Sequence, residues 1–352
     1  MKLKQILVAI MLLTGVVSYA HDFDCTVPGG KLYFNTLDKS KKTVEITYPG
    51  KVSDSLIYSF EKGYRLDIPE TINRNDGEYK VVKIGAKAFE SAEGITDIVL
   101  PATLKEIGNY AFKDCKELNT IYFNSNVELG IGVFYDCTGI ENIRFGGDWK
   151  KIDFEPYRWS TKLSKVVIPP STMVIDGLKY LKNLTDIEVD ELNKTYASEN
   201  GILYDKEKQI LIYCPRNYGN SINIYDGCVI VKEDAFSACV NTEKIIIPAS
   251  VKQMSFRETR RMKKLEEIVL GASMPFATGY DENGTPYFFF QLVERNNVKI
   301  YIPKKVNPEV FYSQMPSEGG NFSVKKEKEG PFYPVFLPQM PLDDKKHLLN
   351  VK

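Results

Sequence analysis

The chain has 352 residues, enough for about two ordinary domains. It carries 46 Lys plus Arg and 46 Asp plus Glu residues, so its net charge of zero gives no electrostatic drive toward nucleic acid or an anionic membrane surface. The only histidines are His21 and His347, which argues against Ser-His-Asp, Cys-His and histidine-metal chemistry.

The first twenty residues are typical of a secretory signal peptide. Two lysines precede a nearly unbroken apolar run from Ile6 to Val17, and Ser18 and Ala20 supply the small residues of a cleavage site. A membrane anchor is the alternative, but the run is shorter than the roughly 20 apolar residues that span a bilayer. We predict cleavage after Ala20, no transmembrane span in the mature chain, and an exported location: periplasm, cell surface or secreted.

A short apolar element recurs along the chain with a period of about 23 residues. Two good copies are Ile95-Thr-Asp-Ile98-Val-Leu100 and Leu118-Asn-Thr-Ile121-Tyr-Phe123. One column of the element runs through ten copies: Leu66, Ile98, Ile121, Ile143, Val166, Ile187, Ile222, Ile245, Ile268 and Ile300. This spacing lies in the range of leucine-rich repeats, so each copy is predicted to contribute one short strand to a parallel sheet.

A second apolar column lies behind the first in each repeat. Its residues are Ile84, Ile107, Leu129, Ile152 and Ile175, followed five positions later by Phe89, Phe112, Phe134, Tyr157 and Tyr180. We predict that Phe89, Phe112, Phe134 and Phe236 are buried and stacked. The segment from Ile107 to Cys115 is predicted as a turn and a short helix on the outer side of its coil. Two periodic columns argue against a β-sandwich with fortuitous spacing.

The predicted fold is an α/β solenoid, a right-handed leucine-rich-repeat superhelix of about ten coils. A parallel sheet forms its inner face, and short helices or turns form its outer face. We predict a signal peptide at 1–20, a β-rich amino-terminal cap with the first coil at 21–70, the solenoid at 71–302, and a carboxy-terminal cap with a flexible tail at 303–352. Inserted hairpins are predicted at about 70–82 and 196–220.

The repeat resembles the BspA-type leucine-rich repeats of bacterial surface proteins, whose pattern is I-G-x-x-A-F-x-x-C-x-x-L-x-x-I-x-(I/L)-P. Here it reads Ile107-Gly108-Asn-Tyr-Ala111-Phe112-Lys-Asp-Cys115, and again Asp234-Ala235-Phe236-Ser-Ala-Cys239 followed by Ile247-Pro248. The segment from Gly201 to Pro215 looks like the inserted hairpin of that family. The resemblance covers about residues 31–325. It implies the solenoid fold and membership among proteins that are mostly adhesin-like or uncharacterised.

Two coils depart from the family pattern. The segment Leu129-Gly-Ile-Gly-Val133-Phe134 is degenerate, and the segment from Ile152 to Tyr157 lacks both the glycine and the Ala-Phe pair. These departures put the coil boundaries there in doubt, but not the architecture.

No catalytic, cofactor-binding or metal-binding residue is predicted, and the chain is predicted not to be an enzyme. It contains no G-x-S-x-G, Walker or dinucleotide-binding motif. Asp186, Glu188 and Asp190 share one strand face, where paired carboxylates for glycoside hydrolysis and a calcium contact are the functional alternatives. We expect a solvated acidic face there, with Lys165 on the neighbouring strand as the salt partner.

The six cysteines invite a disulfide interpretation in an exported chain. Cys115, Cys137 and Cys239, however, occupy one repeat position, and a position fixed by the repeat is a packing position. We predict these three to be reduced and shielded. If any disulfide exists, Cys214 and Cys228, which flank the inserted hairpin, are the better candidates.

In each strand, the residue between two inward residues is predicted to point out of the sheet. Stacking places these residues in one line, which we predict to bind a partner: Val99, Tyr122, Arg144, Val167, Glu188, Ile246, Val269 and Tyr301. Strand propensity alone explains the β-branched members. It does not explain Tyr122 and Arg144, whose residue types are enriched at interface hot spots.

The predicted function is that of a non-enzymatic, adhesin-like protein of the cell envelope or the secreted fraction. We predict that it binds a partner protein through the solenoid surface, without a cofactor and without nucleic acid. Two alternatives stay open: a glycan-binding accessory of a surface polysaccharide system, and a structural component of the envelope.

Overall fold

The computed structural model describes residues 21–28, 30–49, 58–254, 262–271, 299–303, 323–324 and 332–336. The chain divides into two compact units, Met1–Leu163 with Val174–Leu181, and Ser164–Met173 with Lys182–Lys352. The described residues form about eight turns of a β-solenoid. The predicted signal peptide and most of the predicted carboxy-terminal cap lie outside the described residues.

The first unit opens with an antiparallel cap. β1 (Phe23–Val27), β2 (Gly30–Asp38) and β3 (Thr43–Thr47) pair antiparallel in that order, and β3 then pairs in parallel with β6 (Gly77–Ile84). β5 (Thr71–Arg74) forms an antiparallel hairpin with β6. Alternate side chains of β2 and β3 are fully buried: Leu32, Phe34, Val44 and Ile46. The alternation puts one face of the cap against the hydrophobic core.

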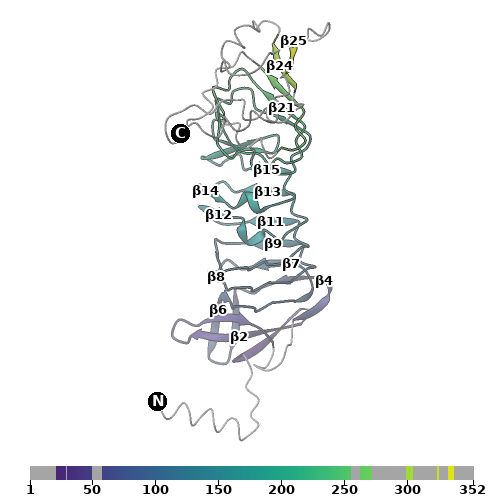
Figure 1. The fold of residues 1–352 in the computed structure, drawn as a ribbon. Helices are drawn as coiled ribbons and strands as arrows, with labels where there is room; N and C mark the ends of the chain where they lie inside the picture. The colour runs from purple at the N-terminus through teal and green to yellow at the C-terminus, as the bar shows by residue number, and fades with distance from the viewer. Residues whose placement is uncertain are drawn as a thin grey trace, which may run out of the picture. The chain divides into compact units, whose positions relative to one another are not determined.

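Each later coil of the first unit contributes an inner strand. β4 (Ser59–Asp67), β7 (Glu93–Leu100), β9 (Thr120–Phe123) and β11 (Asn142–Phe145) form one parallel sheet, in which β7, β9 and β11 are stacked one on another (Figure 1). The register pairs the predicted column residues in sequence: Leu66 with Ile98, Ile98 with Ile121, and Ile121 with Ile143. All four are buried, as the repeat predicts.

The second column lies in outer strands. β6 pairs in parallel with β8 (Glu106–Ile107), and β8 pairs with β10 (Glu128–Leu129). β12 (Lys151–Asp153) pairs with β14 (Val174–Asp176) in the same sense. Each coil therefore has a strand on both sides of the core.

The short outer helices predicted from the sequence are wrong. The described residues contain no α-helix, and only two 3-10 helices, η1 (Glu155–Tyr157) and η2 (Leu178–Tyr180). The reason lies in the hydrogen bonds of the outer turns. The amide of Phe89 donates to Ala111 O at 2.7 Å, and the amide of Phe112 donates to Val133 O at 3.0 Å. These amides bind the next coil, so they are not available for bonds within an α-helix.

The predicted aromatic stack is confirmed for Phe89, Phe112 and Phe134, and it continues to Tyr157. Ring centroids lie 5.1 Å apart for Phe89 and Phe112, 5.6 Å for Phe112 and Phe134, and 5.0 Å for Phe134 and Tyr157. All four side chains are buried, and Phe236 is buried in the second unit. The stack runs along the core of the first unit and fixes the register of its coils.

The glycine of the repeat is explained by close packing of successive turns. A Cβ atom on Gly108 would lie 2.6 Å from the backbone nitrogen of Ala86 in the preceding coil. Any larger residue at this position would push the two turns apart, so the stacked register requires glycine.

The second unit has two parallel inner sheets. β13 (Lys165–Ile168) pairs with β15 (Asp186–Val189). The second sheet contains β19 (Ser221–Asn223), β21 (Lys244–Ile247), β23 (Glu267–Leu270) and β24 (Lys299–Pro303). β26 (Phe332–Phe336) pairs antiparallel with both β24 and β25 (Ser323–Val324). All ten predicted column residues thus lie in strands, divided among three sheets. The count of ten coils and the right-handed winding stay predictions.

An antiparallel insertion lies within the second unit. β16 (Tyr196–Glu199), β17 (Ile202–Asp205) and β18 (Ile210–Tyr213) pair antiparallel, and β18 continues in parallel to β20 (Ile230–Val231). β22 (Gln253–Met254) extends this outer sheet. The insertion therefore joins the solenoid by supplying its first outer strand in this unit.

Candidate functional site

The inner face of the first unit carries one row of predicted site residues. Strand register places Asp67 beside Val99, Val99 beside Tyr122, and Tyr122 beside Arg144. Asp67 and Arg144 are exposed, whereas Val99 and Tyr122 are half-buried. The structure thus brings Val99, Tyr122 and Arg144 together on three adjacent strands.

Tyr122 contacts Arg65, which is not among the site residues predicted from the sequence. The guanidinium carbon of Arg65 lies 4.9 Å from the centroid of the Tyr122 ring. Arg65 Nε also donates to Asp67 Oδ1 at 3.0 Å, and this hydrogen bond raises the pKa of Arg65 above its usual value. Side chains alternate along a strand, so Arg65 and Asp67 lie on the same face of β4. The alternation in the sequence could therefore have placed Arg65 on the face of the predicted row.

Arg144 differs from Arg65 in its electrostatic environment. No salt bridge joins its guanidinium to an acidic residue within the part of the chain that the structure describes. Its side chain is exposed next to Tyr122. A solvated guanidinium beside an aromatic ring can bind a carboxylate through two parallel hydrogen bonds.

In the second unit, Val167 and Glu188 are register partners on β13 and β15. Lys165 Nζ lies 2.6 Å from Glu188 Oε2 and 3.2 Å from Asp186 Oδ2. Its hydrogen bonds to Glu188 and Asp186 raise the pKa of Lys165. The predicted salt partner of this acidic face is therefore confirmed for Glu188 and Asp186.

The remaining predicted residues lie on β21, β23 and β24, where Ile246 pairs with Val269 and Val269 pairs with Tyr301. Ile246 and Tyr301 are half-buried, but Val269 is only 8% exposed. The Tyr301 hydroxyl lies 3.3 Å from Glu267 Oε1, on the strand that carries Val269. The expectation that Val269 is exposed is therefore wrong, because the strand on each side of it carries a large side chain.

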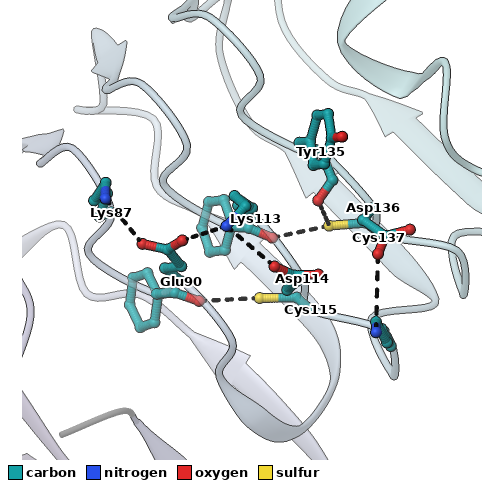
Figure 2. A network of polar contacts seen from close by, with 11 residues as sticks. Lys87, Glu90, Lys113, Asp114, Cys115, Tyr135, Asp136 and Cys137 are labelled. Atoms are coloured by element: carbon teal, nitrogen blue, oxygen red, sulfur yellow. Dashed lines mark hydrogen bonds and ion pairs between the residues drawn. The ribbon is translucent and has the colours of Figure 1, made fainter. Parts of the chain in front are cut away.

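The six cysteines, all within the described residues, are free thiols. Cys115 Sγ lies 3.0 Å from Phe89 O, and Cys137 Sγ lies 2.9 Å from Phe112 O, so each thiol meets a carbonyl of the preceding coil (Figure 2). Burial raises the pKa of Cys137 well above its usual value. The predicted shielding of the shared repeat position is confirmed for Cys115, Cys137 and Cys239.

Cys214 lies beside Cys239 and forms no disulfide with Cys228, the partner that the sequence favours if any disulfide exists. Cys239 Sγ is 3.5 Å from Cys214 O, which puts Cys214 beside Cys239. Cys228 Sγ instead lies 3.3 Å from Ile230 O. The Cys214–Cys228 pairing is therefore absent, because the stacking of coils brings residues one repeat apart into contact.

Two further properties bear on function. Among the described residues, no group of three or more His, Cys, Asp or Glu side chains is placed to hold a metal ion. In the same residues, no helix is long and apolar enough to cross a membrane.

Comparison with known proteins identifies the repeat. The model of the BspA type leucine rich repeat region matches residues 79–200 and 203–278 in six copies, together more than half of the chain. A search of curated proteins gives no match.

Three solved structures are similar to this chain at low identity. The pneumococcal vaccine antigen PcpA matches with 14% identity and a TM-score of 0.44, over 83% of this chain and 96% of that one. A leucine-rich repeat protein from Bacteroides ovatus has 17% identity, a TM-score of 0.36, and coverage of 71% and 72%. The T. pallidum leucine rich repeat protein has 17% identity, a TM-score of 0.38, and coverage of 68% and 96%. On the six-copy match, the chain belongs to the BspA type leucine rich repeat family.

Proposed function

We propose that the protein is a non-enzymatic, adhesin-like binding protein that contacts a partner protein through its inner sheet face. The observation that supports this most is the row of Val99, Tyr122 and Arg144 on adjacent strands. Tyr and Arg are enriched among the residues that dominate binding energy at protein interfaces, and Val99 supplies an apolar neighbour.

Arg65 strengthens the case for Tyr122. Its guanidinium lies against the ring and is itself held by Asp67. A ring fixed in this way loses little rotamer freedom when a partner binds, which favours affinity. Arg144 is exposed beside it and suits a carboxylate of the partner.

The second unit carries its own predicted residues, Val167, Glu188, Ile246 and Tyr301, which we propose as a contact surface of that unit. Their contribution is expected to be smaller. Lys165 already neutralises Glu188, and a surface ion pair adds little binding energy. Val269 contributes to the packing of its sheet instead of to the surface.

We also propose that the chain is exported, on the strength of the signal-peptide pattern in residues 1–20. The mature protein would then reach the periplasm, the cell surface or the medium. The boundaries 21–70, 71–302 and 303–352 belong to the same proposal.

The test is a pull-down with residues 21–352 against host extracellular proteins, run beside a glycan array. The double variant Tyr122→Ala with Arg144→Ala is expected to lose the captured protein. Glu117→Ala, an exposed change away from the inner face, is the matched control and should bind normally. Melting temperatures of all three proteins establish that they are folded.

Three outcomes count against the proposal. Full binding by a folded double variant rejects the central inner face. Glycan hits without protein hits favour the glycan-binding accessory instead. If neither assay gives a hit, a structural envelope component becomes the better interpretation.

A further inference from the structure

The outer turns of the first unit carry a cluster of large side chains, of which only Tyr180 belongs to the aromatic column of the repeat. The rings of Tyr135 and Trp159 lie 5.0 Å apart and are tilted by 54°. The Arg158 guanidinium carbon lies 5.5 Å from the centroid of Trp159 and 5.5 Å from that of Tyr180. We call Tyr135, Arg158, Trp159 and Tyr180 the outer aromatic cluster.

The cluster lies where the sequence departs from the repeat. Trp159 stands at the position that Asp114 and Asp136 occupy in the two preceding coils, where both have left-handed backbone, with φ of 62° and 57°. In the Trp159 coil, η1 covers the residues before this position, and Trp159 is not among the described residues with left-handed backbone. This coil therefore presents Arg158 and Trp159 where the two preceding coils carry Lys113-Asp114 and Tyr135-Asp136.

Core packing does not explain these side chains. Tyr135 is 39% exposed, Arg158 is exposed, and Trp159 and Tyr180 are half-buried. In Figure 2 the Tyr135 ring points away from the buried Cys137 thiol, while its carbonyl faces that thiol. Exposed aromatic rings that do not contribute to a core suggest a contact surface.

The polar groups of the cluster include both hydrogen-bond donors and acceptors. Arg158 Nη1 lies 3.4 Å from Glu155 Oε1, and the two side chains are about half exposed. Lys179 Nζ lies 5.3 Å from the Tyr180 ring centroid. Arg158 is paired with Glu155, so of these three charged groups Lys179 alone adds a positive charge, which is a small excess.

The size of the cluster suits a small ligand. A fully exposed aromatic side chain offers about 150–250 Å² of contact area, so three partly covered rings offer on the order of 300 Å². A stable protein interface buries roughly 800 Å² on each partner. The cluster is therefore too small to anchor a protein partner by itself.

We propose that the outer aromatic cluster is a saccharide-binding site for a neutral glycan. A pyranose ring has C–H groups on its faces, which the negative face of an aromatic ring attracts. It has hydroxyls around its rim, which need donors and acceptors together, as Arg158 and Glu155 supply. The site is distinct from the inner face and does not depend on the protein partner proposed there.

The experiment is native gel electrophoresis of the purified chain in gels that contain laminarin, mannan, xylan or dextran. At least one of these neutral polysaccharides is expected to retard the protein and to protect Trp159 from acrylamide quenching of its fluorescence. Trp159→Ala is expected to weaken binding roughly tenfold, the effect of losing about one ring contact. Tyr225→Ala, which removes an exposed tyrosine of the second unit that also lies under a lysine, is the matched control.

Arg158→Gln serves as a second variant in case Trp159→Ala does not fold, because Arg158 is solvent-exposed. It too should lose retardation. The proposal is overturned if none of the four polysaccharides retards the wild-type chain, or if folded Trp159→Ala and Arg158→Gln bind as well as wild type. It is also overturned if Tyr122→Ala with Arg144→Ala abolishes retardation, since the saccharide would then bind the inner face.

Discussion

Two coils of the first unit differ in how well their core side chains are packed and hydrogen-bonded. In the coil from Ile107 to Cys115, Gly108 permits close stacking and the Cys115 thiol meets a carbonyl of the preceding coil. In the coil from Ile152 to Ser160, the positions of Phe112 and Cys115 carry Tyr157 and Ser160. Both hydroxyls are buried, and neither has a hydrogen-bond partner among the described residues.

The difference indicates a conflict between stability and surface chemistry. A buried hydroxyl without a hydrogen-bond partner costs free energy, so the core of the second coil contributes less to the stability of the fold. The same coil displays Arg158 and Trp159 at its surface. Local departures from a consistent pattern are expected at functional sites, where stability is compensated elsewhere.

The largest expected effect comes from breaking the regular coil. Phe112→Ala removes a fully buried ring from the middle of the stack, and should lower the free energy of unfolding by roughly 3–5 kcal/mol. Urea denaturation of wild type and variant measures this, and Lys116→Ala, an exposed change nearby, should alter stability by less than about 0.5 kcal/mol. A loss below about 1 kcal/mol for Phe112→Ala contradicts the assigned core.

A smaller change in stability, of opposite sign, is expected in the coil from Ile152 to Ser160. Tyr157→Phe keeps the ring in the stack and removes the unpartnered hydroxyl, so stability should rise by about 1 kcal/mol. The matched control is Tyr58→Phe in the same unit. The Tyr58 hydroxyl donates to Thr47 O at 2.7 Å and accepts from the Tyr33 amide at 3.1 Å, so its removal should lower stability. If both variants change stability in the same direction, the Tyr157 hydroxyl does not differ from the Tyr58 hydroxyl in the way proposed.

The smallest effect concerns the polar surface of the regular coils. Lys113 Nζ lies 2.6 Å from Glu90 Oε1, and this hydrogen bond lowers the pKa of Glu90 (Figure 2). Because the folded pKa lies below the unfolded one, the stabilisation is complete above about pH 4.3 and is lost as the pH falls through the folded pKa. Glu90→Gln should therefore destabilise the protein by a few tenths of a kcal/mol at pH 7 and have no effect at strongly acidic pH. A pH-independent difference would show that the ion pair does not stabilise the fold.

Much of the fold could be predicted because the period is a property of the sequence. Ile98, Ile121 and Ile143 recur at the repeat spacing, and the structure pairs them in register. The outer helices were predicted wrongly because the residue types of a turn do not reveal which acceptors its backbone amides bind. Phe112 N donates to the next coil, and only the stacked structure reveals that partner.

The candidate site was less predictable than the fold. Alternation correctly grouped Val99, Tyr122 and Arg144, since side-chain direction along a strand follows from the period of two. It did not reveal that Arg65 reaches across to the Tyr122 ring, because the reach of a long side chain depends on its rotamer. The sequence shows that the coil from Ile152 to Ser160 departs from the repeat, but a weak repeat does not indicate a binding site. Trp159 was therefore not among the predicted site residues.

The hydrogen bonds that link each outer turn to the next have a consequence for how such a chain can evolve. The amide of Phe89 donates to Ala111 O, and the amide of Phe112 donates to Val133 O, so each coil offers its predecessor the same acceptors that its successor offers to it. A duplicated or deleted segment of one whole period therefore leaves every donor facing an acceptor at the new junction. Changes of any other length leave amides without acceptors at that junction. Descendants of this gene are therefore expected to differ in length by multiples of about 23 codons, apart from hairpin insertions such as that of β16 to β18.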